Sequence, residues 1–137
     1  MKTLMTLLLL LASVNTHAQN KQVECMAHAV YHEARGESAT GQAAVAHVVL
    51  NRVGKPGFPN TICGVVYQPQ QFTNIRQTKP DKRSASWTYA IATSAYAIAG
   101  ISQDPTHGAK YFYAQKVVQP HWRKGKKLTV IGNHTFL

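Results

Sequence analysis

Acidic residues are scarce in this 137-residue chain. It has 15 Lys and Arg against 5 Asp and Glu, which gives a formal net charge of +10. Any reaction that needs a carboxylate must therefore use one of five side chains: Glu24, Glu33, Glu37, Asp81 and Asp104. The excess of positive charge favours an anionic partner. We do not expect nucleic acid to be that partner, because the sequence lacks helix-turn-helix, zinc-finger and RNP motifs.

Other familiar motifs are also missing. There is no Gly-rich phosphate loop and no GxSxG nucleophile motif. The length corresponds to one domain, and the hydrophobic share of 45% is enough to form a core, which excludes a disordered basic tail.

The chain has one long apolar run, and it is too short to cross a bilayer. The run covers Leu4 to Ala12, directly after a short positive start. Followed by Thr16-His17-Ala18, it predicts a secretory signal peptide over residues 1–18 and a mature domain over residues 19–137. The alternative is an uncleaved anchor. Cleavage would make the protein secreted or periplasmic, without stable membrane insertion.

Only two cysteines are present, Cys25 and Cys63. An even count in an exported domain predicts a disulfide between them. The alternative is a pair of buried free thiols, and nothing marks either residue as an activated thiolate.

The hydrophobic pattern predicts an α+β fold, mostly helical, with a small antiparallel sheet near the C-terminus. Ser38 or Thr40, Thr61, and Ser84 or Ser86 are expected to cap helices. The polar segment 68–83 is expected to form a long loop. The expected helices cover about 23–34, 41–53, 62–67 and 84–99, and the expected strands cover 110–114, 128–131 and 135–137.

Glu33 is the candidate catalytic acid. Helical spacing places it on the same face as the apolar residues Met26, Ala29 and Val30. Burial disfavours an ionised carboxylate, so the pKa of Glu33 should be raised, as a general acid at neutral pH requires. Glu37, one turn further on, is the secondary acid candidate. The alternative is that both are ordinary exposed acids at a helix end.

A metal site is the rival interpretation. Glu24, His28 and His32 follow one another at intervals of four residues, so a helix would place them in one stripe. His47, His107 or Asp104 could supply a further ligand. The HExxH order is missing, however, and the simpler alternative is three solvated or core-edge side chains. We therefore expect no metal.

Basic residues gather in two places, Lys79, Lys82 and Arg83 in the loop, and Arg123, Lys124, Lys126 and Lys127 near the C-terminus. These clusters indicate either attraction to anionic envelope polymers or a solubilising surface.

Several ordered motifs together resemble the SleB-type cell-wall hydrolase family, whose best-known members are the spore cortex-lytic enzymes. The resemblance covers about residues 24–137. It is carried by segments 24–37 (ECMAHAVYHEARGE), 41–46 (GQAAVA), 49–53 (VLNRV), 58–68 (FPNTICGVVYQ), 71–72 (QF) and 131–136 (IGNHTF).

The resemblance implies a lysozyme-like or lytic-transglycosylase-like domain that acts on peptidoglycan. It also implies that Glu33 is the catalytic acid and that Gln71, Phe72 and Tyr111 contact the sugar. No cofactor is expected, and the protein is expected to act as a monomer.

Two mechanisms remain open for cleavage between N-acetylmuramic acid and N-acetylglucosamine. A hydrolase needs a second carboxylate, about 5–5.5 Å from the first for retention or about 6.5–9.5 Å for inversion. A lytic transglycosylase lets the muramic 6-hydroxyl attack, so one carboxylate can act twice. The scarcity of acids favours the transglycosylase. A muramidase-type hydrolase, a zinc hydrolase and a basic envelope-polymer binding module are the alternatives.

Overall fold

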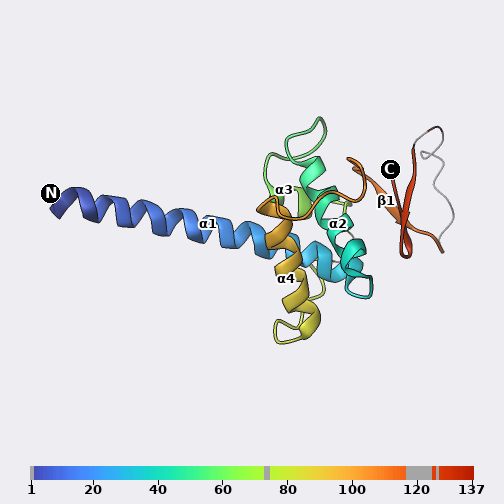
Figure 1. Cartoon of the computed structure of the whole chain (residues 1–137), viewed down its shortest axis with the longest axis horizontal. Coiled ribbons are helices and arrows are strands. Elements are labelled where there is room, and N and C mark those ends of the chain that lie inside the picture. The colour runs from blue at the N-terminus through green and yellow to red at the C-terminus, as the bar shows by residue number, and fades with distance from the viewer. Residues whose placement is uncertain (1, 73–74, 117–124, 126) are drawn as a thin grey trace.

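Three shorter helices gather around one end of the long first helix, and a small sheet follows them (Figure 1). The structure is a computed structural model that describes residues 2–72, 75–116, 125 and 127–137. The helices are α1 (Lys2–Ala34), α2 (Ala39–Arg52), α3 (Ile62–Val66) and α4 (Ala85–Ile98), and the strands are β1 (Phe112–Ala114), β2 (Thr129–Ile131) and β3 (His134–Phe136).

Helix α1 is much longer than the sequence pattern predicts. The expected start near Val23 is wrong, because the helix runs without a break from Lys2. The physical reason is that no Gly or Pro interrupts residues 2–34, so nothing stops helix propagation. Residues 16–21 are exposed, and this end of the helix projects away from the rest of the molecule (Figure 1). Within the described part of the chain, no helix is long and apolar enough to span a membrane.

The core lies where α1 packs against the other three helices. Met26, Ala29 and Val30 are fully buried, which confirms the predicted apolar face of α1. The opposing side chains come from every other helix, and they include Val45, Val48 and Val49 of α2, Val65 and Val66 of α3, and Trp87, Ala90 and Ala97 of α4.

Three hydroxyl side chains begin the shorter helices. Ser38 accepts from the Gly41 amide at 3.2 Å, Thr61 from the Gly64 amide at 3.0 Å, and Ser84 from the Trp87 amide at 3.1 Å. Each bond pairs an amide that the first helical turn leaves without a partner. The predicted caps are confirmed, with Ser38 and Ser84 used in preference to their alternatives.

The predicted disulfide joins Cys25 of α1 to Cys63 of α3, with the two Cα atoms 5.1 Å apart. It links the short helix α3 to the buried part of α1. The loop from 68 to 83 contains turns but, within its described residues, no helix or strand, as expected.

The sheet is antiparallel, with β3 between β1 and β2. Phe112 of β1 pairs with Phe136 of β3, and Ile131 of β2 pairs with His134. All three residues of β3 are buried, whereas β1 and β2 are only partly covered. The α+β expectation is therefore confirmed. The first two strands begin one or two residues later than predicted, and the third is shifted by one residue toward the N-terminus.

Candidate active site

All five carboxylates lie in the described part of the chain, and four of them accept hydrogen bonds. Glu24 pairs with Lys82, and the exposed Asp81 accepts from the Arg83 amide at 3.0 Å. The Glu37 carboxylate accepts from two donors of one residue, Asn133, and the Asp104 carboxylate accepts from four donors.

Glu33 is the exception. Among the described residues, its carboxylate has no hydrogen-bond or ion-pair partner. Glu33 is only partly exposed, and desolvation by the surrounding protein raises the pKa of its carboxyl above the ordinary value. A carboxyl whose pKa is raised by burial holds its proton to a higher pH, and one that no protein donor occupies is able to deliver that proton to a bound substrate.

The carboxylate of Asp104 accepts hydrogen bonds mainly from its own loop. It accepts from the Asn51 side chain at 2.8 Å, the Thr106 amide and hydroxyl at 2.8 and 2.7 Å, and the Gly108 amide at 2.9 Å. Burial by itself would raise the pKa of Asp104, but these hydrogen bonds outweigh it and lower that pKa. Asp104 is therefore an ionised anchor between α2 and the 104–109 turn.

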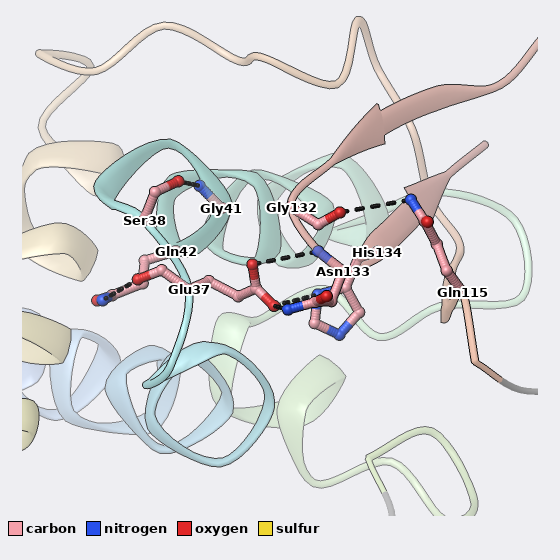
Figure 2. Close-up of polar contacts among 8 residues, drawn as sticks. All are labelled: Glu37, Ser38, Gly41, Gln42, Gln115, Gly132, Asn133 and His134. Carbon is pink, nitrogen blue, oxygen red and sulfur yellow. Dashed lines mark hydrogen bonds and ion pairs between the residues drawn. The ribbon is translucent and has the colours of Figure 1, made fainter.

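Glu37 holds the turn between β2 and β3 (Figure 2). Its carboxylate accepts from the Asn133 side chain at 3.0 Å and from the Asn133 amide at 3.3 Å. His134 lies beside it, with Nδ1 3.6 Å from the carboxylate. Desolvation lowers the pKa of His134 more than the neighbouring Glu37 raises it, which favours the neutral imidazole.

Two glycines make room for Glu37. A Cβ on Gly132 would overlap the Glu37 carboxylate, and a Cβ on Gly41 would lie 2.8 Å from Glu37 Cβ. The side chain of Glu37 is only 9% exposed. The predicted secondary acid is thus placed directly after α1, but its oxygens face the β2–β3 turn.

Arg52 organises the aromatic residues near the predicted sugar contacts. Its guanidinium carbon lies 5.2 Å from the ring centre of Phe58, 5.3 Å from Phe72 and 5.7 Å from Tyr111. Its Nε donates to the Lys110 carbonyl at 2.6 Å. The sequence pattern did not predict that Arg52 would pack against aromatic rings. The fact that could have indicated it is that Arg52 lies on the apolar face of the predicted helix 41–53, where a charged side chain needs buried partners.

The three predicted substrate contacts differ in their surroundings. Phe72 is 6% exposed and packs against Phe112, with 6.4 Å between ring centres, so it belongs to the core. Gln71 is exposed, and Tyr111 is 37% exposed. A hollow of about 420 Å³ adjoins Phe72, and its lining includes Tyr67, Gln68, Ile75 and Arg76.

The residues of the rival metal site do not come together. The rings of His28 and His32 lie 6.3 Å apart, but Glu24 pairs with Lys82. His47 contacts Ser102, and Asp104 is occupied by its own loop. Within the described residues, no three His, Cys, Asp or Glu side chains gather in a metal-binding arrangement. Of the C-terminal basic cluster, Arg123, Lys124 and Lys126 lie outside the described residues, while Lys127 is exposed.

The fold matches two solved catalytic domains. The catalytic domain of the Bacillus cereus SleB protein aligns with a TM-score of 0.70 and 36% identity, covering 86% of this chain and 89% of that one. The catalytic domain of the germination-specific lytic transglycosylase SleB from Bacillus anthracis aligns with a TM-score of 0.69 and 36% identity, covering 84% and 92%. The fold class is therefore lysozyme-like, as expected.

Residues 36–137 match the Cell Wall Hydrolase family, and the chain belongs to that family. It is 37% identical over 123 residues to the spore cortex-lytic enzyme of Bacillus cereus, covering 89% of this chain and 46% of the relative. It is 35% identical over 118 residues to the spore cortex-lytic enzyme of Bacillus subtilis, covering 85% and 37%. The chain thus spans less than half the length of these curated relatives.

Proposed function

We propose that this protein cleaves the glycan strands of peptidoglycan between N-acetylmuramic acid and N-acetylglucosamine, as a lytic transglycosylase. The observation that carries the proposal is the contrast between Glu33 and the other four carboxylates. In the described part of the chain, Glu33 alone combines desolvation with a carboxylate free of hydrogen bonds, whereas the carboxylates of the other four acids all accept them. Family membership and the resemblance to spore cortex-lytic enzymes supply the substrate class.

In this mechanism Glu33 acts twice. Its carboxyl donates a proton to the glycosidic oxygen as the bond from that oxygen to muramic C1 breaks, and positive charge develops at C1. The muramic 6-hydroxyl oxygen then bonds to C1, and its proton passes to the Glu33 carboxylate. The carboxyl is thereby restored, and the product ends in a 1,6-anhydro ring. The raised pKa suits the first step because it extends the protonated, proton-donating form to higher pH.

The occupied carboxylates support this mechanism over hydrolysis. A hydrolase would need a second carboxylate to hold a water or to bond to C1. Glu37 bonds to the β2–β3 turn and Asp104 to its own loop, so using either for catalysis would break those contacts. We assign Glu37 as a positioning residue that fixes the turn beside the end of α1.

The test is Glu33→Gln on purified peptidoglycan, with Lys55→Gln as the control at an exposed residue outside both hollows. General acid catalysis typically contributes about 10²–10⁴-fold, so the Glu33 variant should lose activity by that factor and the control should not. Equal activity of Glu33→Gln and wild type would refute the role of Glu33.

Mass analysis of the products separates the chemistries. Anhydromuramic ends are expected, and reducing ends would show that the protein is a muramidase-type hydrolase. Strongly salt-dependent binding without any bond cleavage would instead identify a basic module for envelope polymers.

We also propose that the protein is exported, with cleavage after Ala18. The exposure of residues 16–21, on the projecting part of α1, supports access for a peptidase. The N-terminus of the exported protein should then be Gln19. A product that retains Met1 in the membrane fraction would show an uncleaved anchor.

A further inference from the structure

A second hollow lies on a different flank of α1 from Glu33. It has a volume of about 500 Å³ and is lined by His28, Lys79, Pro80, Asp81, Lys82 and Arg83. His28 and Glu33 are five residues apart on one helix. This separation places them about 7.5 Å apart along the axis and about 140° apart around it. The two sites are therefore close but face different directions.

One residue in the wall of this hollow, His28, has an unpaired polar atom. Within the described residues, Nδ1 of His28 and Nε2 of the neighbouring His32 are buried and have no hydrogen-bond partner. The His28 ring packs edge-on against Trp87, with 5.1 Å between ring centres. Buried polar atoms are normally paired, so the unpaired Nδ1 of His28 is unusual, and a small rotation of the ring would turn it toward a ligand in the hollow.

The rim of the hollow carries an excess of positive charge. The carboxylate of Glu24 engages Lys82, whose ammonium also lies 5.8 Å from the centre of the Trp87 ring. Asp81 is 3.8 Å from the Arg83 guanidinium, and both side chains are largely exposed, so this pairing is weak. Lys79 has no ion-pair partner in the described part of the chain. Lys79 and Arg83 are thus free to contact an anion.

We propose that this hollow binds the free carboxylates of the peptide stems that branch from peptidoglycan. The inference rests on the proposed function, because the stem is attached to the muramic sugar whose bond Glu33 would break. An extended peptide covers at most about 3.3–3.6 Å per residue, so three residues reach about 10 Å. That reach is comparable with the diameter of a helix, about 10–12 Å with its side chains. A stem that starts near Glu33 can therefore extend around α1 to Lys79 and Arg83.

The test compares two substrates of one enzyme. Intact peptidoglycan carries the stems, and glycan strands stripped by an amidase do not. The double variant Lys79→Ala/Arg83→Ala should raise KM on intact peptidoglycan by about tenfold, the effect of losing one charge-assisted hydrogen bond. On the stripped strands the same variant should match wild type. The control is Lys55→Ala/Lys116→Ala, which removes two exposed positive charges elsewhere and should leave KM unchanged on both substrates.

The ways in which this test can fail are distinguishable. Equal losses on both substrates, or an equal loss in the control, would overturn the stem site and leave general electrostatic attraction. Absence of cleavage of either substrate by wild type would instead overturn the proposed function.

Direct binding supplies a readout that is independent of activity. The soluble tripeptide L-Ala–γ-D-Glu–meso-diaminopimelate should shift the ring signals of His28 in NMR spectra of wild type, and not in the Lys79→Ala/Arg83→Ala variant. If inorganic phosphate shifts these signals and the tripeptide does not, the site binds a phosphate-bearing polymer and the proposal is wrong.

Discussion

The carboxylate of Glu37 accepts hydrogen bonds from both the side chain and the backbone amide of Asn133, at 3.0 and 3.3 Å. These residues are 96 positions apart in the chain, and their contact joins the end of α1 to the turn between β2 and β3 (Figure 2). The sheet is otherwise in limited contact with the helices, so this pair has a direct effect on where the sheet lies relative to Glu33.

Gly132→Ala should destabilise the protein through a clash with Glu37. The added Cβ would overlap the Glu37 carboxylate, at a residue whose φ is +57°. Gly100→Ala is the matched control, because Gly100 has a φ of +73° but no atom within 4 Å of the added Cβ. Urea unfolding should show that the Gly132 variant loses about 1–3 kcal/mol more than the control, the typical cost of overpacking. Similar losses in both variants would mean that backbone strain alone explains the effect.

Glu37→Gln should affect stability more than chemistry. The amide keeps one acceptor oxygen for Asn133 but loses the negative charge that strengthens the bonds, so we expect a loss of about 1–2 kcal/mol in the free energy of unfolding. Activity on peptidoglycan should stay within about tenfold of wild type, far above that of Glu33→Gln. A loss as large as that of Glu33→Gln would show that Glu37 takes part in the reaction itself.

Glu33→Gln should make the protein more stable at neutral pH. Burial raises the pKa of Glu33 in the folded state, so the folded protein binds this proton more tightly than the unfolded chain does. Wild-type stability therefore falls as pH rises from the ordinary glutamate pKa through the raised folded pKa, by about 1.4 kcal/mol for each pH unit that separates these two pKa values. Below the ordinary pKa the carboxyl is protonated in both states, and the two proteins should have the same pH dependence. Parallel stability curves from acidic to neutral pH would contradict the raised pKa.

Arg52→Lys should disturb the aromatic residues around the guanidinium. Lysine retains the positive charge but loses the planar group that packs against Phe58, Phe72 and Tyr111. It also loses the Nε–H that donates to the Lys110 carbonyl. A partly buried carbonyl without its donor costs about 1 kcal/mol, the low end of the range for buried groups, and thermal unfolding followed by tryptophan fluorescence should show the loss. An unchanged melting temperature would show that Arg52 contributes only its charge.

Removing the disulfide with Cys25→Ala/Cys63→Ala should lower stability by about 4 kcal/mol in the chain-entropy model, since the bonded cysteines are 38 residues apart. A reducing agent should destabilise wild type by a similar amount and leave the double variant unchanged. A response of the double variant to the reducing agent would indicate another cause.

The helices that the sequence predicted correctly have strong local signals. The caps Ser38, Thr61 and Ser84 begin three of them. The apolar spacing in α1 correctly predicted that Met26, Ala29 and Val30 are buried. The same local reasoning failed at the start of α1, because periodicity shows which residues are buried and says little about where an uninterrupted helix begins.

Phe72 illustrates a different difficulty. The resemblance to the family predicts that Phe72 contacts the sugar, and that role stays a prediction. Its ring is 6% exposed and packs against Phe112, which lies far along the chain in β1, and it also lines the hollow of about 420 Å³. A sequence cannot distinguish an aromatic residue that faces a ligand from one that packs beside the site, because that depends on which strand covers it.

By itself, the sequence determined the short list of five acids and led to the hypothesis that Glu33 is the catalytic one, and it predicted the pairing of the two cysteines that the structure shows. These follow from composition and from the faces of one helix, which are local properties. Only the tertiary structure decided what the other acids do. The donors to Glu37 and Asp104 come from distant segments, Asn133 and Asn51, and folding alone brings them into hydrogen-bond distance. Folding also places His28 of α1 and the segment 79–83 around the same hollow, and a sequence cannot show this because the two parts of the chain are about 50 residues apart.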